Sequence, residues 1–188
     1  SITLMAVGHR VVHGGEYFAN SAIINDSVIK NITKCISLSP LHNPANLEGI
    51  YQCRKLLPNT PQVVVFDTAF HQTLPPRAHI YPIAWDLYIK DRIRRYGFHG
   101  TSHRFIAQKA AELMNKPIED LALITAHLGS GCSATAILGG ISQDTTMGLT
   151  PLEGLMMGSR SGAVDPAIYD FLSQKVGWDI PVAYKHMT

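Results

Sequence analysis

The sequence holds one acid, one histidine and two arginines in settings that suit phosphoryl transfer. Asp67 follows an apolar run, His99 lies in a glycine-rich stretch, and Arg10 and Arg160 each have glycines nearby, far apart along the chain. Phosphoryl transfer needs cations around the moving group, an acid for Mg²⁺ and a site for the donor phosphates. Arginine suits the first task because it stays charged and binds planar oxygens at two points. The alternative interpretation is that each residue makes only its own local salt bridge or turn.

A glycine turn, Gly129-Ser130-Gly131, is the candidate site for the donor phosphates. Glycine at both positions would let the backbone adopt positive φ and let a ligand approach the bare main chain. Successive N–H groups in such a turn can form a concave nest for an anion. An ordinary hairpin explains the same residues, and the turn alone favours that interpretation. No Walker-type GxxxxGK[ST] segment is present, which excludes the P-loop route.

The elements that must position these residues follow an α/β pattern. Strands are predicted over 2–12 and 62–66, with a short apolar run over 22–24 between them. The continuous apolar run 62–66 is typical of a strand buried on both faces of a parallel sheet. Three short antiparallel strands are predicted over 121–126, 132–138 and 141–145. Helices are expected after a cap at Asp26 or Ser27, after a cap at Asn43, near Ala84, after a cap at Thr101 or Ser102, and at Asp165-Pro166. We expect a domain boundary near Thr68, dividing the chain into 1–68 and 69–188.

Apolar stripes are predicted for four of these helices, among them the second and the fourth. Leu47, Ile50, Tyr51 and Leu57 form the expected buried face of the helix that starts at Asn43. The stripe of the helix after Ser102 consists of Phe105, Ile106, Ala110, Leu113 and Met114. Both stripes follow the 3.6-residue period of an amphipathic helix.

His99 and His103 are four residues apart, a spacing that also suits metal ligands on one helix face. Gly100 would interrupt that helix turn, no HExxH glutamate is present, and no nearby Cys or acid completes a ligand set. We therefore predict that His99 stands just before the helix and points into a cleft. His103 is predicted to pack in the interior or to cap the helix.

Composition excludes several classes of protein. The 188 residues carry a net charge of +2 and have the apolar and charged fractions of an ordinary globular protein. Arg92, Arg94 and Arg95 form the one dense basic cluster, without interleaved aromatic residues, so nucleic acid is not an expected partner. No apolar run is long enough to span a membrane. Three cysteines outside metal spacing predict reduced thiols in a cytoplasmic protein. The chain starts at Ser1 without Met, and we expect its natural beginning upstream.

Longer motifs carry a resemblance over nearly the whole chain. They are Gly8-His9-Arg10-Val11-Val12-His13-Gly14-Gly15, Leu41-His42-Asn43-Pro44-Ala45-Asn46, the segments 65–73 and 95–103, His127-Leu128-Gly129, 150–158 and Arg160-Ser161-Gly162 with Asp165-Pro166. In this order they resemble the acetokinase family. The resemblance implies an actin/sugar kinase/Hsp70-type fold, built of two ribonuclease H-like domains with a cleft between them. It implies reversible transfer of the ATP γ-phosphate to acetate, with Mg²⁺, by a cytoplasmic homodimer.

The same resemblance implies roles for individual residues. Asp67, His99 and Arg160 would be catalytic, with His99 stabilising the transition state and Asp67 lying near metal and acetate. Arg10 would join Arg160 in holding acetate and the transferring phosphoryl group. Four residues would line the pocket for the acetate methyl, namely Val12, Leu41, Phe98 and Pro151. The ATP phosphates would bind the hairpin formed by His127, Leu128, Gly129, Ser130 and Gly131.

Several positions depart from the family pattern. Ser130 replaces the usual Asn of the hairpin, Thr146 a usual Ser, Ser159 a usual Thr and Ala163 a usual Asp. Family chains are about twice as long. Their opening Asn-x-Gly-Ser-Ser-Ser turn, their Gly-Gly-Ile-Gly-Glu-Asn adenosine loop and a Mg²⁺-binding Glu have no match here. Residues 1–68 would then be the C-terminal part of the first domain, and 69–188 the N-terminal part of the second, nucleotide-binding domain.

These departures predict that the 188-residue chain alone is not a competent kinase. Two alternatives stay open. Propionate or another short-chain acid is the first, although Val12 favours acetate. A non-catalytic nucleotide-binding module of the same fold is the second, and the changes at Ser130 and Ala163 support it.

Overall fold

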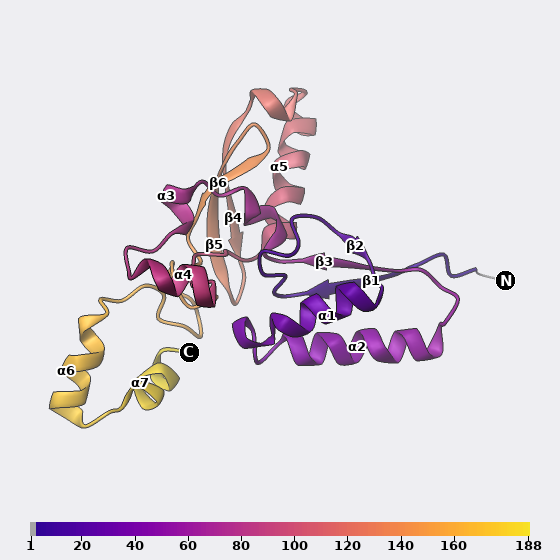
Figure 1. Cartoon of the computed structure of the whole chain (residues 1–188). Coiled ribbons are helices and arrows are strands. Elements are labelled where there is room, and N and C mark those ends of the chain that lie inside the picture. The colour runs from indigo at the N-terminus through magenta and orange to yellow at the C-terminus, as the bar shows by residue number, and fades with distance from the viewer. Residues whose placement is uncertain (1–2) are drawn as a thin grey trace.

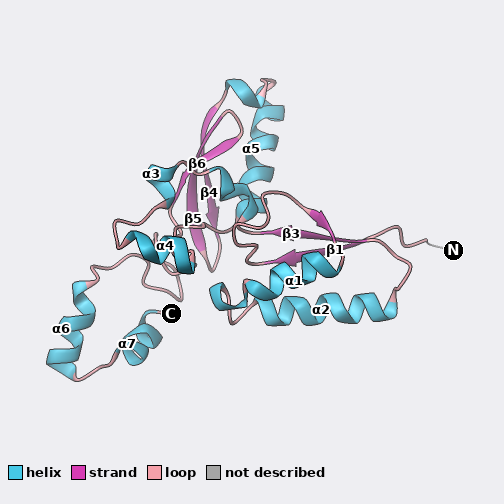
Figure 2. Ribbon diagram, viewed as in Figure 1, coloured by secondary structure: helices cyan, strands magenta, loops and turns pink. Residues whose placement is uncertain are grey.

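The computed structural model describes residues 3–188, which form two three-stranded sheets with helices packed on them (Figures 1 and 2). The first sheet has the order β1-β3-β2, with β1 spanning Val7–Val11, β3 Gln62–Phe66 and β2 Ala22–Ile23. β1 and β3 are parallel and β2 is antiparallel to β3. The strand predicted over 62–66 is therefore confirmed, as is its parallel pairing, but only one of its faces is fully buried and the other is half-buried.

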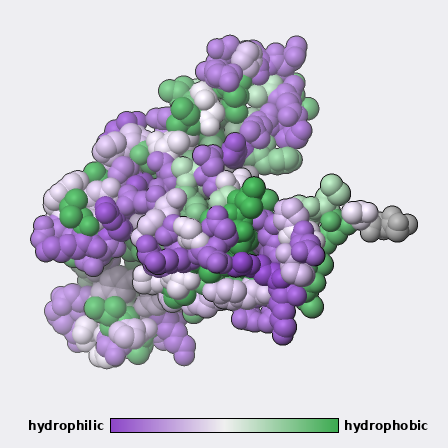
Figure 3. All heavy atoms as spheres, turned by 45° about the vertical axis from the view of Figure 1, so that its right-hand side comes forward, coloured by the Kyte–Doolittle hydropathy of each residue, from purple (hydrophilic) through white to green (hydrophobic). Residues whose placement is uncertain are grey.

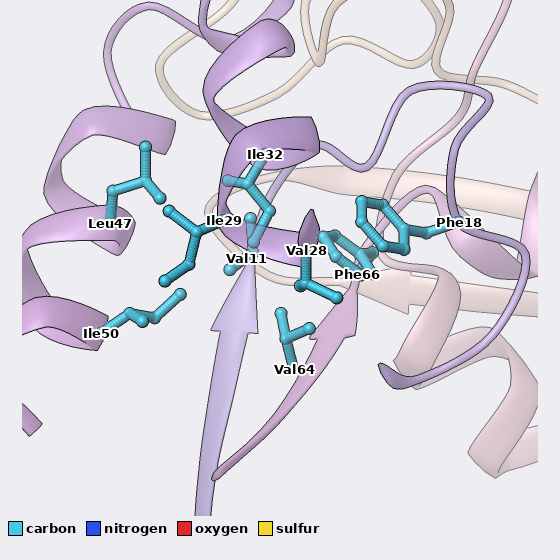
Figure 4. Packing of buried hydrophobic residues seen from close by; sticks show 9 residues of the cluster. All are labelled: Val11, Phe18, Val28, Ile29, Ile32, Leu47, Ile50, Val64 and Phe66. Atoms are coloured by element: carbon cyan, nitrogen blue, oxygen red, sulfur yellow. The ribbon is translucent and has the colours of Figure 1, made fainter. Parts of the chain in front are cut away.

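Helices α1 (Asp26–Lys34) and α2 (Asn43–Leu56) pack on each other and on one face of this sheet (Figure 1). Their contact encloses the main apolar core, in which the Phe18 and Phe66 rings stack with centroids 4.2 Å apart. The side chains from both helices point toward strands β1 and β3, which carry Val11 and Val64 (Figure 4). The core residues are Val11, Phe18, Val28, Ile29, Ile32, Leu47, Ile50, Val64 and Phe66. Tyr51, predicted to be buried, is exposed, so α2 buries a narrower stripe than the periodicity suggested.

The second sheet is an antiparallel meander of β4 (Ala122–Leu128), β5 (Cys132–Leu138) and β6 (Ile141–Thr145). This confirms the three predicted strands. Helix α5 (Gly100–Met114) lies beside the sheet and contacts β4 (Figure 1). The buried positions of the sheet carry many hydroxyl groups, from Thr125, Ser133, Thr135, Ser142 and Thr145.

The remaining elements connect and flank the two sheets. Between β3 and α5 lie the 3₁₀ turn η2 (Ala69–Thr73), the short helix α3 (Pro76–His79) and α4 (Trp85–Asp91). Further 3₁₀ turns are η1 (Ile36–Leu38) and η3 (Ile118–Asp120), and the chain ends in α6 (Ala167–Val176) and α7 (Ile180–Met187). Within residues 3–188 no helix combines the length and apolarity needed to cross a membrane. The boundary near Thr68 falls between the two sheets but stays a prediction.

Three predicted helix caps are wrong, each for a local reason. The Asn25 side chain accepts from the Val28 N–H and caps α1, so Asp26 and Ser27 lie inside the helix. Asn43 begins α2, but its side chain is turned inward to the backbone of His13. α5 begins one residue after His99, ahead of Thr101 and Ser102.

The predicted stripe of α5 is also wrong. The helix buries Gly100, His103, Ala107 and Ala111 instead, whereas Leu113 is 89% exposed. The glycine and alanine residues on the inner face let the helix approach the sheet closely. Because this face consists of glycine, alanine and histidine, it gives only a weak signal in the hydrophobic periodicity. Apolar side chains also reach the surface elsewhere, where Figure 3 shows separate apolar patches among hydrophilic residues.

The basic cluster is used in ion pairs within the chain. Arg94 Nη1 lies 2.9 Å from Glu16 Oε1, and Arg92 Nη1 lies 3.5 Å from the other oxygen of Glu16. Arg95 Nη2 lies 2.7 Å from Glu153 Oε1, and Glu153 also accepts a hydrogen bond from Tyr81. These pairs attach the segment after α4 to Glu16, which follows β1, and to Glu153, which follows β6.

Candidate active site

Two parallel strand ends bring Arg10 and Asp67 together. Arg10 pairs in register with Val65 of β3, and the Asp67 N–H donates to the Val11 carbonyl at 3.1 Å. Arg10 then donates from Nε to Asp67 Oδ1 at 2.9 Å and from Nη2 to Oδ2 at 2.6 Å. This hydrogen-bonded pairing raises the pKa of Arg10. The anion that Arg10 meets within the chain is thus Asp67.

Asp67 also positions His99. Its backbone carbonyl accepts from the Gly100 N–H at 2.8 Å, so the start of α5 is attached to the end of β3. A Cβ on Gly100 would overlap that carbonyl, which makes glycine necessary for the close approach. His99 itself adopts φ of 58° at the position before α5, in the left-handed region that few non-glycine residues occupy. His99 lies just before the helix and faces a cavity, as predicted.

The His99 ring is neutral at neutral pH. Burial, and secondarily the neighbouring His127, lower the pKa of His99 to about 4. The two rings stack with centroids 3.9 Å apart. His127 Nδ1 lies 2.9 Å from Ser102 Oγ, which ties the end of β4 to the first turn of α5. His103 packs in the interior, as predicted, with Ser133 and Thr125 as hydrogen-bond partners.

The hairpin turn between β4 and β5 borders Arg160 and His99. A Cβ on Gly131 would lie 2.8 Å from Arg160 Nη2 and 3.3 Å from His99 Nε2. Arg160 is held from the other side, where Nη1 donates to the Pro151 carbonyl at 2.8 Å. The expectation of positive φ at Gly129 and Gly131 is wrong, because neither residue adopts it. The reason for glycine at 131 is close approach to the guanidinium.

A cavity of about 430 Å³ collects the predicted catalytic and substrate residues. Its polar lining includes Arg10, Asp67, His99 and Arg160, and its apolar lining includes Val12, Leu41, Phe98 and Pro151. The cavity wall is uneven, since Phe98 is buried whereas Leu41 is 82% exposed. A more open hollow of about 680 Å³ near the end of α5 contains none of these residues.

The cavity also has lining residues that the sequence interpretation did not single out. They include Ser39, His42, Thr150, Tyr184 and Thr188. His42 and Thr150 lie inside two of the motifs on which the resemblance rests, so that proximity was an available signal. Tyr184 belongs to α7, and nothing in its local sequence predicts that α7 folds back to the cavity.

The hairpin residues 127–131 lie beside the cavity rather than in its lining. In the turn, Gly129 donates to the Gly131 carbonyl at 3.1 Å, which closes the loop. The backbone N–H groups of Ser130 and Gly131 donate to no group in the described part of the chain. They are the two amides that an anion at the turn could use.

Comparisons with known proteins identify the family to which the sequence is similar. The model of the acetokinase family matches residues 1–183. The acetate kinase of Caldanaerobacter subterraneus is 60% identical over 172 residues, and that of Thermoanaerobacter pseudethanolicus is 62% identical over 172 residues. Each match covers 92% of this chain and 43% of the relative, so the chain spans less than half the length of these curated relatives.

Solved structures give the same fold. The acetate kinase of Porphyromonas gingivalis superposes with a TM-score of 0.94 at 48% identity, over 97% of this chain and 46% of that chain. A propionate kinase from Francisella tularensis gives 0.92 at 49% identity, over 98% and 48%. The α/β, actin/sugar kinase-type fold class predicted from the sequence is thereby confirmed.

Proposed function

The chain belongs to the acetokinase family, and we propose that it supplies the acyl-substrate cavity and part of the nucleotide site of an acetate kinase. The reaction moves the ATP γ-phosphate reversibly to acetate, giving acetyl phosphate and ADP. ATP, acetate and Mg²⁺ are the proposed ligands, and a cytoplasmic homodimer is the proposed form of the whole protein. Each of these assignments extends family membership to a chain that spans 43% of its relatives.

The observation that carries this proposal is that two arginines line the same cavity, each with part of its guanidinium hydrogen-bonded within the chain and part of it free. Arg10 is held through Nε and Nη2 by Asp67, and Arg160 is held through Nη1 by the Pro151 carbonyl. Arg10 Nη1 and Arg160 Nη2 have no hydrogen-bond partner in the described part of the chain. Two fixed cations with free N–H groups suit a carboxylate and a transferring phosphoryl group, because their orientation is set before the substrates bind.

The apolar wall argues for a short acyl chain. Val12, Phe98 and Pro151 border the same cavity as the arginines. Phe98 packs with Met147 and Met157, which fixes the ring. A carboxylate held by Arg10 would thus direct its methyl group toward a rigid apolar surface, while its oxygens face the cations.

His99 adds a neutral hydrogen-bond donor to this charged site. With a pKa of about 4, its ring is uncharged at neutral pH. An uncharged donor can stabilise negative charge that grows on the phosphoryl oxygens in the transition state without adding a third cation. We propose this role for His99, and electrostatic stabilisation of the same oxygens for Arg160.

The hairpin is proposed to hold the ATP phosphates. The N–H groups of Ser130 and Gly131 are unpaired within the described chain, and Gly131 lies beside Arg160. His127 and Leu128 lead into the turn, and Gly129 closes it. Phosphates bound at this turn would lie next to the Arg160 guanidinium, which is proposed to meet the γ-phosphoryl group.

The cavity offers few protein ligands for Mg²⁺. Among residues 3–188 no three His, Cys, Asp or Glu side chains gather as a metal site. Asp67 is the one carboxylate of the cavity lining, and both of its oxygens face Arg10. Such a site fits a Mg²⁺ ion held mainly by ATP oxygens, with Asp67 nearby, which is the usual mode for this ion. Bound there, Mg²⁺ would neutralise phosphate charge.

Propionate is a second candidate acceptor, and the exposure of Leu41 favours it. That side chain lines the cavity yet is 82% exposed, so the wall can move outward for one more methylene. Val12 limits the opposite side. One methylene is worth about 1–3 kcal/mol of discrimination. We therefore expect acetate to be preferred over propionate by roughly tenfold or more in kcat/KM.

A chimera tests the proposed function. Residues 1–188 replace the matching segment of the Caldanaerobacter subterraneus acetate kinase, and acetyl phosphate formation is measured with acetate and with propionate. We expect acetate-dependent turnover that Arg160→Ala lowers by orders of magnitude. A folded chimera that binds ATP but forms no acyl phosphate would contradict the proposal and favour a nucleotide-binding module.

The isolated chain provides the companion experiment. We expect no turnover from it, because its relatives have more than half of their length outside the matched region. Turnover by the isolated chain at the rate of the chimera would overturn that expectation. Calorimetric titration with acetate and with ATP–Mg²⁺ then reports which ligand site is complete in these residues.

A further inference from the structure

A buried chain of hydrogen bonds leads from His99 into the sheet. Ser133 Oγ lies 2.8 Å from His99 Nδ1 and 2.7 Å from His103 Nε2. His103 Nδ1 lies 2.8 Å from Thr125 Oγ1. Ser133, His103 and Thr125 are all buried, on β5, α5 and β4 respectively. His99 is the one member of this chain that lines the cavity.

The protons along this chain have two consistent arrangements. A serine hydroxyl has one proton, so Ser133 donates to one histidine and accepts from the other. In the first arrangement Thr125 donates to His103, His103 Nε2–H donates to Ser133, and Ser133 donates to His99 Nδ1. In the second, every donor and acceptor is reversed, and His99 carries its proton on Nδ1.

The Thr125 hydroxyl distinguishes the two arrangements. Its one hydrogen-bond partner in the described chain is His103 Nδ1. In the second arrangement Thr125 accepts from His103, and its own buried O–H has no acceptor. In the first arrangement the Thr125 hydroxyl proton is donated to His103 Nδ1, so no buried donor in the chain of hydrogen bonds lacks an acceptor. Since a buried donor without an acceptor is costly, the first arrangement is favoured.

We infer that Thr125, His103 and Ser133 are positioning residues that hold His99 in the tautomer with its proton on Nε2. The inference extends the proposed function, in which His99 donates a hydrogen bond to the phosphoryl group. The geometry of the hairpin agrees, because a Cβ on Gly131 would lie 3.3 Å from His99 Nε2. Nε2 is thus the ring nitrogen that faces the hairpin and Arg160, and the relay places the proton on it.

Burial of the two rings supports the relay, which requires neutral histidines. Burial, together with the neighbouring His71, His99 and His127, lowers the pKa of His103 to about 3. His71 does not compete for Ser133, because its Nε2 faces the Phe98 carbonyl at 3.0 Å and its Nδ1 faces Ser142 Oγ at 2.9 Å. That carbonyl also fixes the backbone just before His99.

Nuclear magnetic resonance of the chain labelled with ¹⁵N-histidine tests the inference without any activity. The tautomer of each neutral ring is read from which nitrogen carries the proton. We expect His99 and His103 to be protonated on Nε2, in roughly tenfold or greater excess. Protonation of His99 on Nδ1 in the unmodified chain would overturn the inference, whatever the variants do.

Three variants at two matched positions test whether the Thr125 hydroxyl causes the preference of His99 for the tautomer protonated on Nε2. Thr125→Val keeps the side-chain shape, removes the hydroxyl and is expected to turn His99 into a mixture of tautomers. Thr125→Ser keeps the hydroxyl and the single tautomer. Thr135→Val is the control, because Thr135 is buried opposite Thr125 but bonds Thr145 instead of a histidine. An unchanged His99 tautomer in Thr125→Val, or an equal change in Thr135→Val, would contradict the relay.

The chimera separates this inference from the proposed function. We expect Thr125→Val to lower kcat several-fold with little change in KM for ATP or acetate, and Thr125→Ser to restore it. A shifted tautomer without a change in kcat would support the relay and contradict the role proposed for His99. A reduced kcat with an unchanged tautomer would contradict the relay.

Discussion

Arg10 and Asp67 share a two-point ion pair in which one partner is buried and the other is not. The Asp67 side chain is 4% exposed, whereas the Arg10 side chain is 65% exposed. If Asp67 were removed, water could solvate the exposed Arg10 guanidinium. If Arg10 were removed, water could not easily reach the buried Asp67 carboxylate. The pair is consequently a stabilising contact for the fold and, through the free Nη1, a component of the proposed substrate site.

This asymmetry predicts that Arg10→Met costs more stability than Asp67→Asn. Removal of Arg10 leaves a buried carboxylate without its two charged donors, at a cost of about 1–3 kcal/mol of unfolding free energy. Asp67→Asn leaves a guanidinium in water and a neutral amide in the interior, and should cost about 1 kcal/mol. Urea unfolding of both variants at pH 7 measures the difference. Equal costs, or the reverse order, would show that the exposed guanidinium does not stabilise the carboxylate.

Buried histidines predict a loss of stability in mild acid. Burial lowers the pKa of His71 to about 4 and that of His103 to about 3, from 6.5 in an unfolded chain. Between about pH 6 and pH 4 the unfolded state therefore binds protons that the folded state does not. Their stabilising effect is complete above pH 6.5 and falls as the pH falls, by about 1.4 kcal/mol per pH unit for each histidine.

Urea unfolding at several pH values between 7 and 4.5 checks this slope. His71→Gln and His103→Gln should each remove about 1.4 kcal/mol per pH unit from it, whatever they cost at pH 7. Glutamine suits the comparison because its amide can donate and accept but does not titrate. A slope that stays the same in both variants would assign the acid sensitivity to other groups.

The strands and the cavity residues were accessible from the sequence because their signals are local. The run 62–66 is continuously apolar, and Arg10 is a charge within an apolar strand. Parallel pairing of two such strands then places Arg10 beside Asp67 without further information. The position of His99 just before the helix was predicted from the glycine that follows it, Gly100, which is visible in the sequence alone.

The inner face of α5 was not accessible in this way. Hydrophobic periodicity selected Phe105 and Leu113, but the helix buries Gly100, His103 and Ala107. The reason is that the sheet face beneath it carries hydroxyl groups, which favour histidine partners and small residues over large apolar ones. Which helix face meets such a surface depends on long-range pairing, and no single-sequence pattern reports it. The relay to Ser133 was hidden for the same reason.

Gly131→Ala is expected to impair catalysis while leaving the fold intact. The new Cβ would lie 2.8 Å from Arg160 Nη2, the far end of a flexible side chain, so the guanidinium moves and the backbone does not. Stability should change by less than about 0.5 kcal/mol. In the chimera kcat/KM should fall on the order of tenfold or more, because a small displacement of a positioned group is costly.

Gly129→Ala is the matched control for that change. A Cβ at this position would meet the Gly131 carbonyl at 3.5 Å, an ordinary contact, and neither glycine has positive φ. We expect its kcat/KM to stay within about twofold of the parent chimera. A similar loss in both variants would attribute the effect to the flexibility of the hairpin rather than to the position of Arg160.

Ser130→Asn is expected to strengthen nucleotide binding. Ser130 is exposed at the tip of the hairpin, where its side chain makes no hydrogen bond within the described chain, so the change should leave stability within about 0.5 kcal/mol. Asparagine has a longer side chain with two N–H donors that can reach a phosphate oxygen. The serine hydroxyl is closer to the backbone and reaches less far toward that oxygen. One such bond to a charged group corresponds to roughly tenfold in affinity.

The readout for Ser130→Asn is the KM for ATP and the KM for acetate of the chimera, measured separately. The KM for ATP should fall, whereas the KM for acetate should not change, because Ser130 lies outside the cavity lining that holds Arg10 and Val12. Ser130→Ala provides the opposite arm and should raise the KM for ATP. If the acetate KM moved with either variant while the ATP KM stayed fixed, the hairpin would belong to the acyl site and the proposed phosphate role would be wrong.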